Sequence, residues 1–298
     1  MDWEKLGQIY QVNNSNPYLL THASNPLPLH LDGDVYRIFY NGRNPDNKSS
    51  VSYVDINIIT YEIVNDPKTP ILTYGDKNSF YSHGISIGNV FSYKEESYIG
   101  FMGWQIRDNN HWRGDLGKFE IKRSLASTPS MLLDKSSQDP ISTSYPYVVK
   151  EGNLYKMWYG STINWTSENG EMIHVLKYAE SFDTKTWVNH QLALPYIIGK
   201  AQAFSRPTLL KINNTWNMWY SYRSGDGTLY RIGHATSNNG KTFNLNPTPN
   251  LTTSPSGWDS EMVCYPYVFR HQNKIYMLYN GNDHGKEGFG LAVLKNKN

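Results

Sequence analysis

The chain has few cysteines, few charged residues and no long apolar run, and each of these features excludes a class of protein. It has 298 residues and a single cysteine, Cys264, which excludes an internal disulfide and any metal site built on several thiolates. Only 18% of the residues are charged and the net charge is +2, so no basic surface for nucleic acid or for a membrane is indicated. No apolar run is long enough to span a membrane, and the N-terminal residues do not resemble a signal peptide. We therefore expect a cytoplasmic protein.

Aromatic residues, in contrast, are abundant. They make up 14% of the chain, with 23 Tyr and 9 Trp. Aromatic side chains are typical of β-strands, and they are also the side chains on which sugar rings stack. The length suffices for one large all-β domain with a substantial core.

An internal repeat runs through the whole sequence. Tyr40, Met102, Tyr159, Tyr220 and Tyr279 occupy matching positions, separated by 62, 57, 61 and 59 residues, in the segments VYRIFYNGR, SYIGFMGW, LYKMWYGS, TWNMWYSYR and IYMLYNGN. A strand-like run precedes each segment and another follows it. Such repetition at a fixed period, without helical periodicity between copies, is typical of propellers.

The repeat predicts an all-β fold, a five-bladed β-propeller in a single domain that covers residues 1–298. We place the blades at approximately 20–65, 80–127, 140–190, 202–245 and 258–298. The last copy stops near the end of the chain, so residues 1–12 are expected to supply the outer strand of the last blade and close the ring.

The repeat also predicts which loops share a face. The loops after the second strand of each unit are the longer ones, and they contain Arg43, Trp104, Arg107, His111, Trp112, Trp165, Arg223 and His284. Entries to the first strands should reach the same face beside the central axis, in a space that we call the funnel. They bring His22, Asn25, His83, Tyr145, Gln202, Arg206, Trp258, Asp259, Glu261 and Tyr265.

Two carboxylates stand two residues apart in GWDSEMVCYPYV. In an extended chain Asp259 and Glu261 would point to the same side. Glycosidic cleavage needs a proton donor and a nucleophile or base. An aromatic funnel should raise the pKa of Glu261, which makes Glu261 the candidate acid and Asp259 a candidate partner. Asp46, Asp226 and Asp283 are other options for the partner. A salt bridge of Glu261 with Arg206, and a turn-capping role for Asp259, are the structural alternatives.

Basic and aromatic residues suggest the nature of the ligand. Arg43, Arg206, Arg223, His22 and His83 would suit a carboxylate or phosphate, so the partner is a carbohydrate or sugar-phosphate ligand. The full set of predicted binding residues is His22, Asn25, Arg43, His83, Trp104, Tyr145, Arg206, Arg223, Trp258, Tyr265 and Asn282. The sequence predicts no metal, because no ligand spacing is recognisable, and no cofactor. Exposed aromatic side chains would allow a homodimer.

These residues and segments resemble the five-bladed propeller glycosidases of glycoside hydrolase families 32, 43, 68 and 130. The blade rhythm, the YAES run with a Trp that follows, and the X-Pro strand entries carry the likeness over the whole chain. The pieces YRIFYNGR, SSVSYVDI, GWDSEM and YNGN are similar to glycosidase-like proteins of bacterial surface-polysaccharide gene clusters. The resemblance implies glycoside processing in bacterial surface-glycan metabolism.

The chain departs from that pattern at the positions that matter most for hydrolysis. The resemblance implies carboxylates before three prolines, but this sequence has Asn25, Tyr145 and the pair Ser205 and Arg206 there. The Gly-x-Glu-Asp-Pro-Arg signature of family 130 is absent as well. Three hypotheses therefore stay open: a glycosidase-like enzyme that uses Glu261, a sugar-transfer enzyme that uses an activated or phosphorylated sugar, and a non-catalytic glycan-binding propeller.

Overall fold

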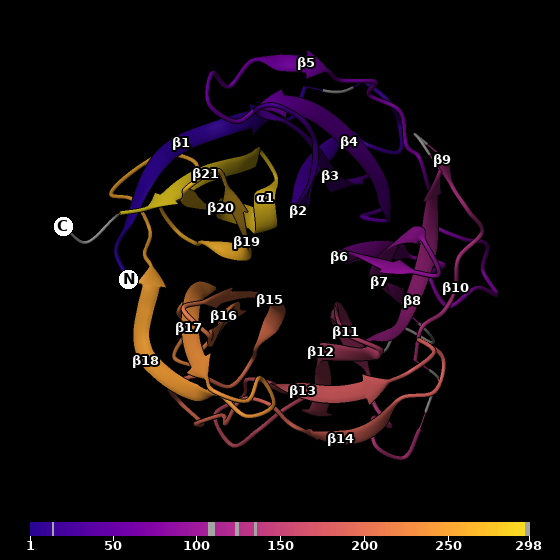
Figure 1. Cartoon of the computed structure of the whole chain (residues 1–298), viewed down its shortest axis with the longest axis vertical. Helices are drawn as coiled ribbons and strands as arrows, with labels where there is room; N and C mark the ends of the chain where they lie inside the picture. Colours follow the sequence, from indigo (N-terminus) through magenta and orange to yellow (C-terminus); the bar gives the residue numbers. More distant parts are fainter. Residues whose placement is uncertain (14, 107–110, 123–124, 134–135, 296–298) are drawn as a thin grey trace.

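The computed structural model describes residues 1–13, 15–106, 111–122, 125–133 and 136–295, and strands dominate it. The strands stand in sheets around a central axis, and the first described strand lies beside the last on one side of the ring (Figure 1). The one helix among these residues is the short α1 (Asn282–Gly285). None of the helices described is long and apolar enough to cross a membrane.

The strands group into antiparallel units that follow the sequence repeat. The first two units contain β2 (Thr21–Asp32), β3 (Val35–Arg43), β4 (Ser49–Asn57) and β5 (Ile63–Asn65), then β6 (Gly84–Tyr93), β7 (Glu96–Ile106), β8 (Trp112–Lys122), β9 (Leu125–Ala126) and β10 (Ser130–Met131). The next two contain β11 (Thr143–Glu151), β12 (Leu154–Asn164), β13 (Ile173–Ser181) and β14 (Val188–Leu192), then β15 (Ser205–Ile212), β16 (Thr215–Tyr222), β17 (Arg231–Ser237) and β18 (Asn244–Leu251). The last contains β19 (Cys264–His271), β20 (Lys274–Asn280), β21 (Gly288–Leu294) and β1 (Trp3–Gln11).

The units close into a ring. The innermost strands β2, β6, β11, β15 and β19 each contact the next, and β19 contacts β2. The first two units are joined by one parallel pair, Ser49 with Gly84. β1 pairs antiparallel with β21, so the N-terminal strand completes the last sheet, as expected. The predicted β-propeller fold is confirmed, and we interpret the five antiparallel units as five blades.

The outer strands extend beyond the predicted blade limits. β10 lies after residue 127, β14 runs past residue 190 and β18 runs past residue 245. These outer segments are exposed for much of their length, so they lack the buried, repeated pattern that identified the inner strands in the sequence.

The hydrophobic core lies between neighbouring sheets. One cluster holds Trp158 and Met218 between the third and fourth units, and another holds Tyr40 and Leu278 between the first and last. Similar clusters fill the other three gaps between units. Burial of apolar area stabilises the fold by about 25 cal/mol per Å². The ring therefore depends on contacts between repeats, which explains why each repeat carries large aromatic residues on its middle strand.

Candidate functional site

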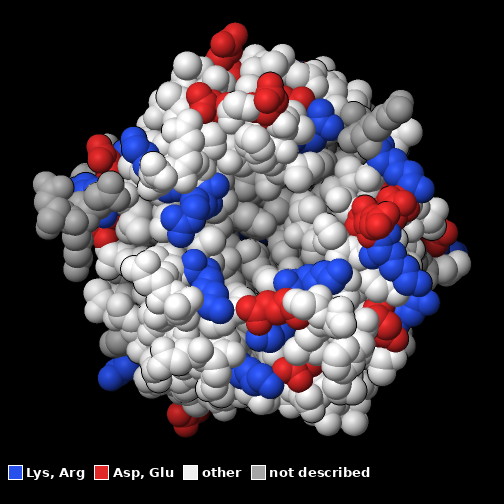
Figure 2. Space-filling model, in the orientation of Figure 1, with Lys and Arg blue, Asp and Glu red and all other residues white. Residues whose placement is uncertain are grey.

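A pocket of about 510 Å³ opens at the centre of one face of the ring. Figure 2 shows this hollow with Lys and Arg side chains at its edge. Its lining comes from every unit: Asn25, Asn41, Arg43 and Ser49 from the first, Met102, Trp104 and Trp112 from the second, Ser144, Tyr145 and His174 from the third, Ser205, Arg223 and Tyr230 from the fourth, and Tyr265 and His284 from the last. We call it the central pocket.

A repeated backbone distortion brings side chains to this centre. The pairing of the inner strand with the middle strand shifts register around the residue before a proline, at Asn25, Tyr145, Arg206 and Tyr265. These four residues have φ angles of 57°, 42°, 47° and 52°, the left-handed region that costs a non-glycine residue roughly 1–3 kcal/mol. Strain of this kind concentrates at functional sites. Three of the four residues, all except Arg206, line the central pocket.

Aromatic rings form one wall of the central pocket. Tyr265 lies 5.6 Å from Tyr145, 6.2 Å from Tyr230 and 5.9 Å from His284, measured between ring centroids. Burial raises the pKa of Tyr145 and Tyr265, so both hydroxyls stay protonated and can donate hydrogen bonds. The wall therefore offers apolar ring faces together with phenolic donors, the combination that a sugar ring requires.

The charged residues that line the central pocket are basic. Arg43 and Arg223 are its two arginines, and among the described lining residues there is no Asp or Glu. Burial, with a further contribution from Arg43 and Arg223, lowers the pKa of His284 to about 4. Burial and then Arg223 lower the pKa of His174 to about 4. Both imidazoles are therefore neutral at pH 7, and the positive charge belongs to the arginines.

His174 sits between two hydroxyl groups. Ser144 Oγ lies 2.6 Å from its Nε2, and Thr162 Oγ1 lies 2.8 Å from its Nδ1. A neutral imidazole has one donor and one acceptor nitrogen, so one of these hydroxyls donates to the ring. Gly160 leaves room for the pair, because a Cβ there would meet both Ser144 and His174. His174 is therefore a neutral pocket residue whose two ring nitrogens are both engaged by hydroxyl groups.

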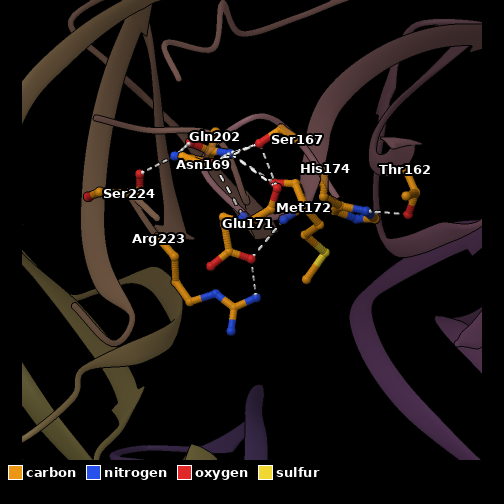
Figure 3. A network of polar contacts seen from close by, with 9 residues as sticks. All are labelled: Thr162, Ser167, Asn169, Glu171, Met172, His174, Gln202, Arg223 and Ser224. Atoms are coloured by element: carbon orange, nitrogen blue, oxygen red, sulfur yellow. Dashed lines mark hydrogen bonds and ion pairs between the residues drawn. The ribbon is translucent and has the colours of Figure 1, made fainter. Parts of the chain in front are cut away.

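The carboxylate of Glu171 stands at the margin of the pocket, next to the lining residue Met172. Glu171 Oε1 accepts a hydrogen bond from Arg223 at 2.8 Å and another from the backbone N–H of Met172 (Figure 3). The loop that carries Glu171 is held by the buried Gln202, whose amide group contacts Ser167 and Asn169. The backbone of Gln202 also bonds to Arg223 and His174. Gln202 therefore fixes the relative positions of the groups at this side of the pocket.

The candidate catalytic carboxylates are not in the central pocket. Glu261 is exposed, and Asp259 is buried against Lys5 Nζ at 2.6 Å and Tyr279 Oη at 3.0 Å. The expectation that both face the funnel is wrong, because they lie in a turn before β19 and not in an extended strand. The structural alternative, a salt bridge of Glu261 with Arg206, is also absent among the ion pairs of the described residues.

Arg206 also lies outside the pocket lining. It is 1% exposed, and its guanidinium donates to the carbonyl oxygens of Tyr265 at 2.7 Å, Pro266 at 3.2 Å and Pro26 at 2.9 Å. Burial lowers its pKa to about 10, so it keeps its charge at neutral pH. The prediction of a ligand-binding Arg206 is corrected: the side chain joins three units at the axis.

The other predicted binding residues divide into three groups. Asn25, Arg43, Trp104, Tyr145, Arg223 and Tyr265 line the central pocket, and their role in binding stays a prediction. His22 and His83 line two neighbouring pockets. Trp258 packs on Tyr279 with ring centroids 5.1 Å apart, and Asn282 Oδ1 accepts the N–H groups of Glu261 and Met262. Trp258 and Asn282 thus support the turn that carries Asp259, outside the pocket.

Several pocket residues escaped the sequence reasoning. His174 lies in the third strand of its unit and Tyr230 lies just before the third strand of the next unit. In the sequence these segments indicate only the repeat and give no sign of a pocket. The small residues Ser144 and Ser205 precede the strained pre-proline residues, and this shared position is the signal that could have found them. Arg107, which we assigned to the same face, lies outside the described residues. Among the residues that the structure describes, no group of three or more His, Cys, Asp or Glu side chains could hold a metal ion.

Two proteins of Mycobacterium tuberculosis are similar over nearly the whole chain. The uncharacterized proteins Rv1502 of strain ATCC 25618 / H37Rv and MT1551 of strain CDC 1551 / Oshkosh are each 34% identical over 304 residues, covering 99% of this chain and 100% of the relative. The chain belongs to their family. No family model matches the sequence.

Solved structures of glycoside hydrolases have the same fold. The α-L-arabinofuranosidase of Podospora anserina, solved with cellotriose, has a TM-score of 0.70 at 10% identity and covers 99% of this chain and 97% of its own. A thermostable family-43 glycoside hydrolase has a TM-score of 0.63 at 15% identity, with 96% and 94% covered. At these identities the likeness establishes a glycosidase-like propeller fold.

Proposed function

We propose that the protein is a glycosidase-like propeller whose central pocket binds a carbohydrate with an acidic group. One observation carries this: aromatic rings and two arginines line the pocket, and no carboxylate appears among its described lining residues. Arginine binds carboxylate or phosphate oxygens through paired donors, and aromatic faces accept sugar rings. The glycoside hydrolases of the same fold support carbohydrate as the ligand class.

Unpartnered polar atoms support a polar ligand in this pocket. The buried Asn25 Oδ1 and Ser205 Oγ have no hydrogen-bond partner, and neither does Nε of Arg223. All three residues line the central pocket. A buried polar atom without a partner is costly, roughly 1–3 kcal/mol. These atoms have almost no accessible surface, so a sugar would satisfy Asn25 and Ser205 with its hydroxyl groups, and Arg223 with its acidic group, only after the side chains turn toward it.

Hydrolysis by a pair of carboxylates is not part of this proposal. That mechanism needs two carboxyl groups on either side of the glycosidic bond. The described lining has no carboxylate: Glu171 at its margin is engaged with Arg223, and Asp283 lines an adjoining pocket that shares Arg43 and His284 with the central pocket. We therefore assign the pocket the recognition of an acidic sugar, with bacterial surface glycans as the expected source.

The test compares acidic sugars with their neutral parents. Glucuronic acid, galacturonic acid, glucose 6-phosphate, glucose and galactose are titrated into the protein by calorimetry at low ionic strength. A hydrogen bond to a charged group contributes about 1.5–3 kcal/mol, so at least one acidic sugar should bind roughly 10- to 100-fold more tightly than its neutral parent. Equal affinity for acidic and neutral sugars, or no binding by any acidic sugar, would contradict the proposal.

A variant pair isolates the arginine contribution. Arg43→Gln should remove most of the preference for the acidic sugar, because the charged donor is lost. Arg270→Gln changes the net charge equally at an exposed residue of β19 outside the central pocket, and should leave the affinity unchanged. The same loss in both variants would point to the overall charge of the molecule as the cause.

A further inference from the structure

A second pocket of about 430 Å³ lies beside the central pocket. It is lined by Lys48, Lys77, Asn78, Ser82, His83, Gln105 and Ile106, and we call it the side pocket. Ile106, at the end of β7, lines both pockets. The ring of His83 lies 5.9 Å from the ring of Trp104, a lining residue of the central pocket. The two hollows are therefore adjacent, and one extended ligand can reach both.

The side pocket carries positive charge, and its described lining has no acidic residue. Lys48 and Lys77 make no ion pair among the described residues, and no Asp or Glu is among the residues that line the pocket. Lys48 Nζ rests over the ring of Tyr74 at 4.9 Å, which holds the ammonium group in place. Asp76 precedes Lys77, but its Oδ1 accepts the backbone N–H groups of Asn78 and Ser79 and makes no ion pair among the described residues.

The neutral polar groups of the side pocket suit an anion as well. Ser82 Oγ and the backbone N–H of Ile106 both contact His83 Nδ1, at 3.2 Å and 3.3 Å. Because Nδ1 accepts the N–H of Ile106, the proton of a neutral His83 is on Nε2, where it can be donated to a ligand. The pocket thus combines two ammonium groups with an imidazole donor.

We infer that the side pocket is a second anion-binding subsite, so that the ligand carries two acidic groups, one for each pocket. Either a second carboxylate in an acidic glycan chain or a phosphate on the sugar has this chemistry. The inference rests on the proposed function for the identity of the first group, but the side pocket itself is tested separately. It also assigns Lys48 and Lys77 a part in selecting doubly acidic ligands over singly acidic ones.

The first experiment uses inorganic phosphate as the probe. The imidazole signals of His83 are followed by NMR during phosphate titration at low ionic strength. We expect a saturable shift in the native protein and in Arg43→Gln, and an at least tenfold weaker apparent affinity in the double variant Lys48→Gln/Lys77→Gln. Persistence in Arg43→Gln separates this subsite from the central pocket, so the failure of one proposal does not imply the failure of the other.

A matched control has the same change in charge. Lys150 and Lys274 are exposed and lie in or beside the turns between first and second strands, at the opposite end of the sheets. Lys150→Gln/Lys274→Gln should leave the response of His83 to phosphate unchanged. The inference is overturned if His83 shows no saturable shift, or if both double variants weaken the response equally.

A second arm distinguishes the two sources of the acidic group. Galacturonic acid and its linear trimer are titrated into the native protein and into Lys48→Gln/Lys77→Gln. For a glycan chain, the native protein should bind the trimer more tightly than the monomer, and the double variant should lose this advantage. If phosphate shifts His83 but the trimer has no advantage, the second group is a phosphate. If neither probe responds to the substitution, the side pocket is not an anion subsite.

Discussion

His174 illustrates how one buried side chain couples the site to stability. Burial keeps its pKa at about 4 in the folded protein, against an ordinary value of 6.5 when unfolded. Between these values the unfolded chain binds the proton and the folded chain does not. The free energy of unfolding should therefore fall as the pH drops from about 6.5 to 4, and each pKa unit corresponds to about 1.4 kcal/mol.

This gives a prediction for His174→Gln. Urea unfolding of the native protein should lose stability below pH 6.5, by about 3 kcal/mol at pH 4 from His174 alone. His174→Gln should be less stable than the native protein at pH 7, but its stability should depend less on pH over the same range. His22, whose pKa burial and Arg43 lower to about 3, keeps part of the slope in both proteins. Parallel slopes would show that His174 titrates normally.

At the scale of elements, the turn before β19 decides how the last sheet is completed. Asp259 in that turn binds Lys5 of β1 and Tyr279 of β20, so a single carboxylate connects three segments of the last unit. The same turn is braced by Asn282, which accepts two backbone N–H groups. The two neighbouring carboxylates thus differ in environment: Asp259 is buried and bonded to Lys5 and Tyr279, whereas Glu261 is exposed to solvent.

Asp259→Ala is expected to destabilise the protein without touching the central pocket. The substitution leaves the Tyr279 hydroxyl buried without its acceptor and Lys5 without its counterion, at a cost of about 1–3 kcal/mol. Glu261→Ala, at an exposed position two residues away, should change stability by no more than about 0.5 kcal/mol. Thermal unfolding of both variants measures the difference. A large effect at Glu261 and none at Asp259 would reverse these assignments.

The elements were more predictable than the orientation of side chains within them. Matched aromatic segments identified the middle strands, because those strands are buried on both faces by neighbouring units. The alternation rule failed at Asp259 and Glu261, because it holds only inside a strand and β19 begins at Cys264. A pattern of residue types does not reveal where a strand starts when the preceding turn is as polar as the strand entry.

At the scale of the whole molecule, Arg206 ties the ring together at its axis. Its guanidinium donates hydrogen bonds to carbonyl oxygens of the first and last units, although Arg206 itself belongs to the fourth. The sequence placed this arginine in the ligand site because it stands at a strand entry that leads to the funnel and because its charge suits a carboxylate or phosphate. Only the closed ring shows that its longer side chain reaches other inner strands.

Arg206→Ala should therefore be among the most destabilising single substitutions. It leaves three carbonyl groups without their donor and a cavity at the axis, and we expect a loss of at least about 3 kcal/mol. Arg270→Ala, at an exposed residue, is the comparison and should cost less than about 0.5 kcal/mol. Chemical denaturation of both variants tests this. A stable Arg206→Ala protein that loses sugar binding would instead return Arg206 to the ligand site.

The pairing of β1 with β21 has a consequence for how the chain is made. Residues 3–11 are synthesised well before their partner, residues 288–294, because the other described strands lie between them in the sequence. During synthesis β1 therefore waits for its strand partner while the strands between them are made. The ring therefore cannot close through this pairing until β21 has been made, and a nascent chain interrupted before β21 would leave the edge of β1 without this strand partner.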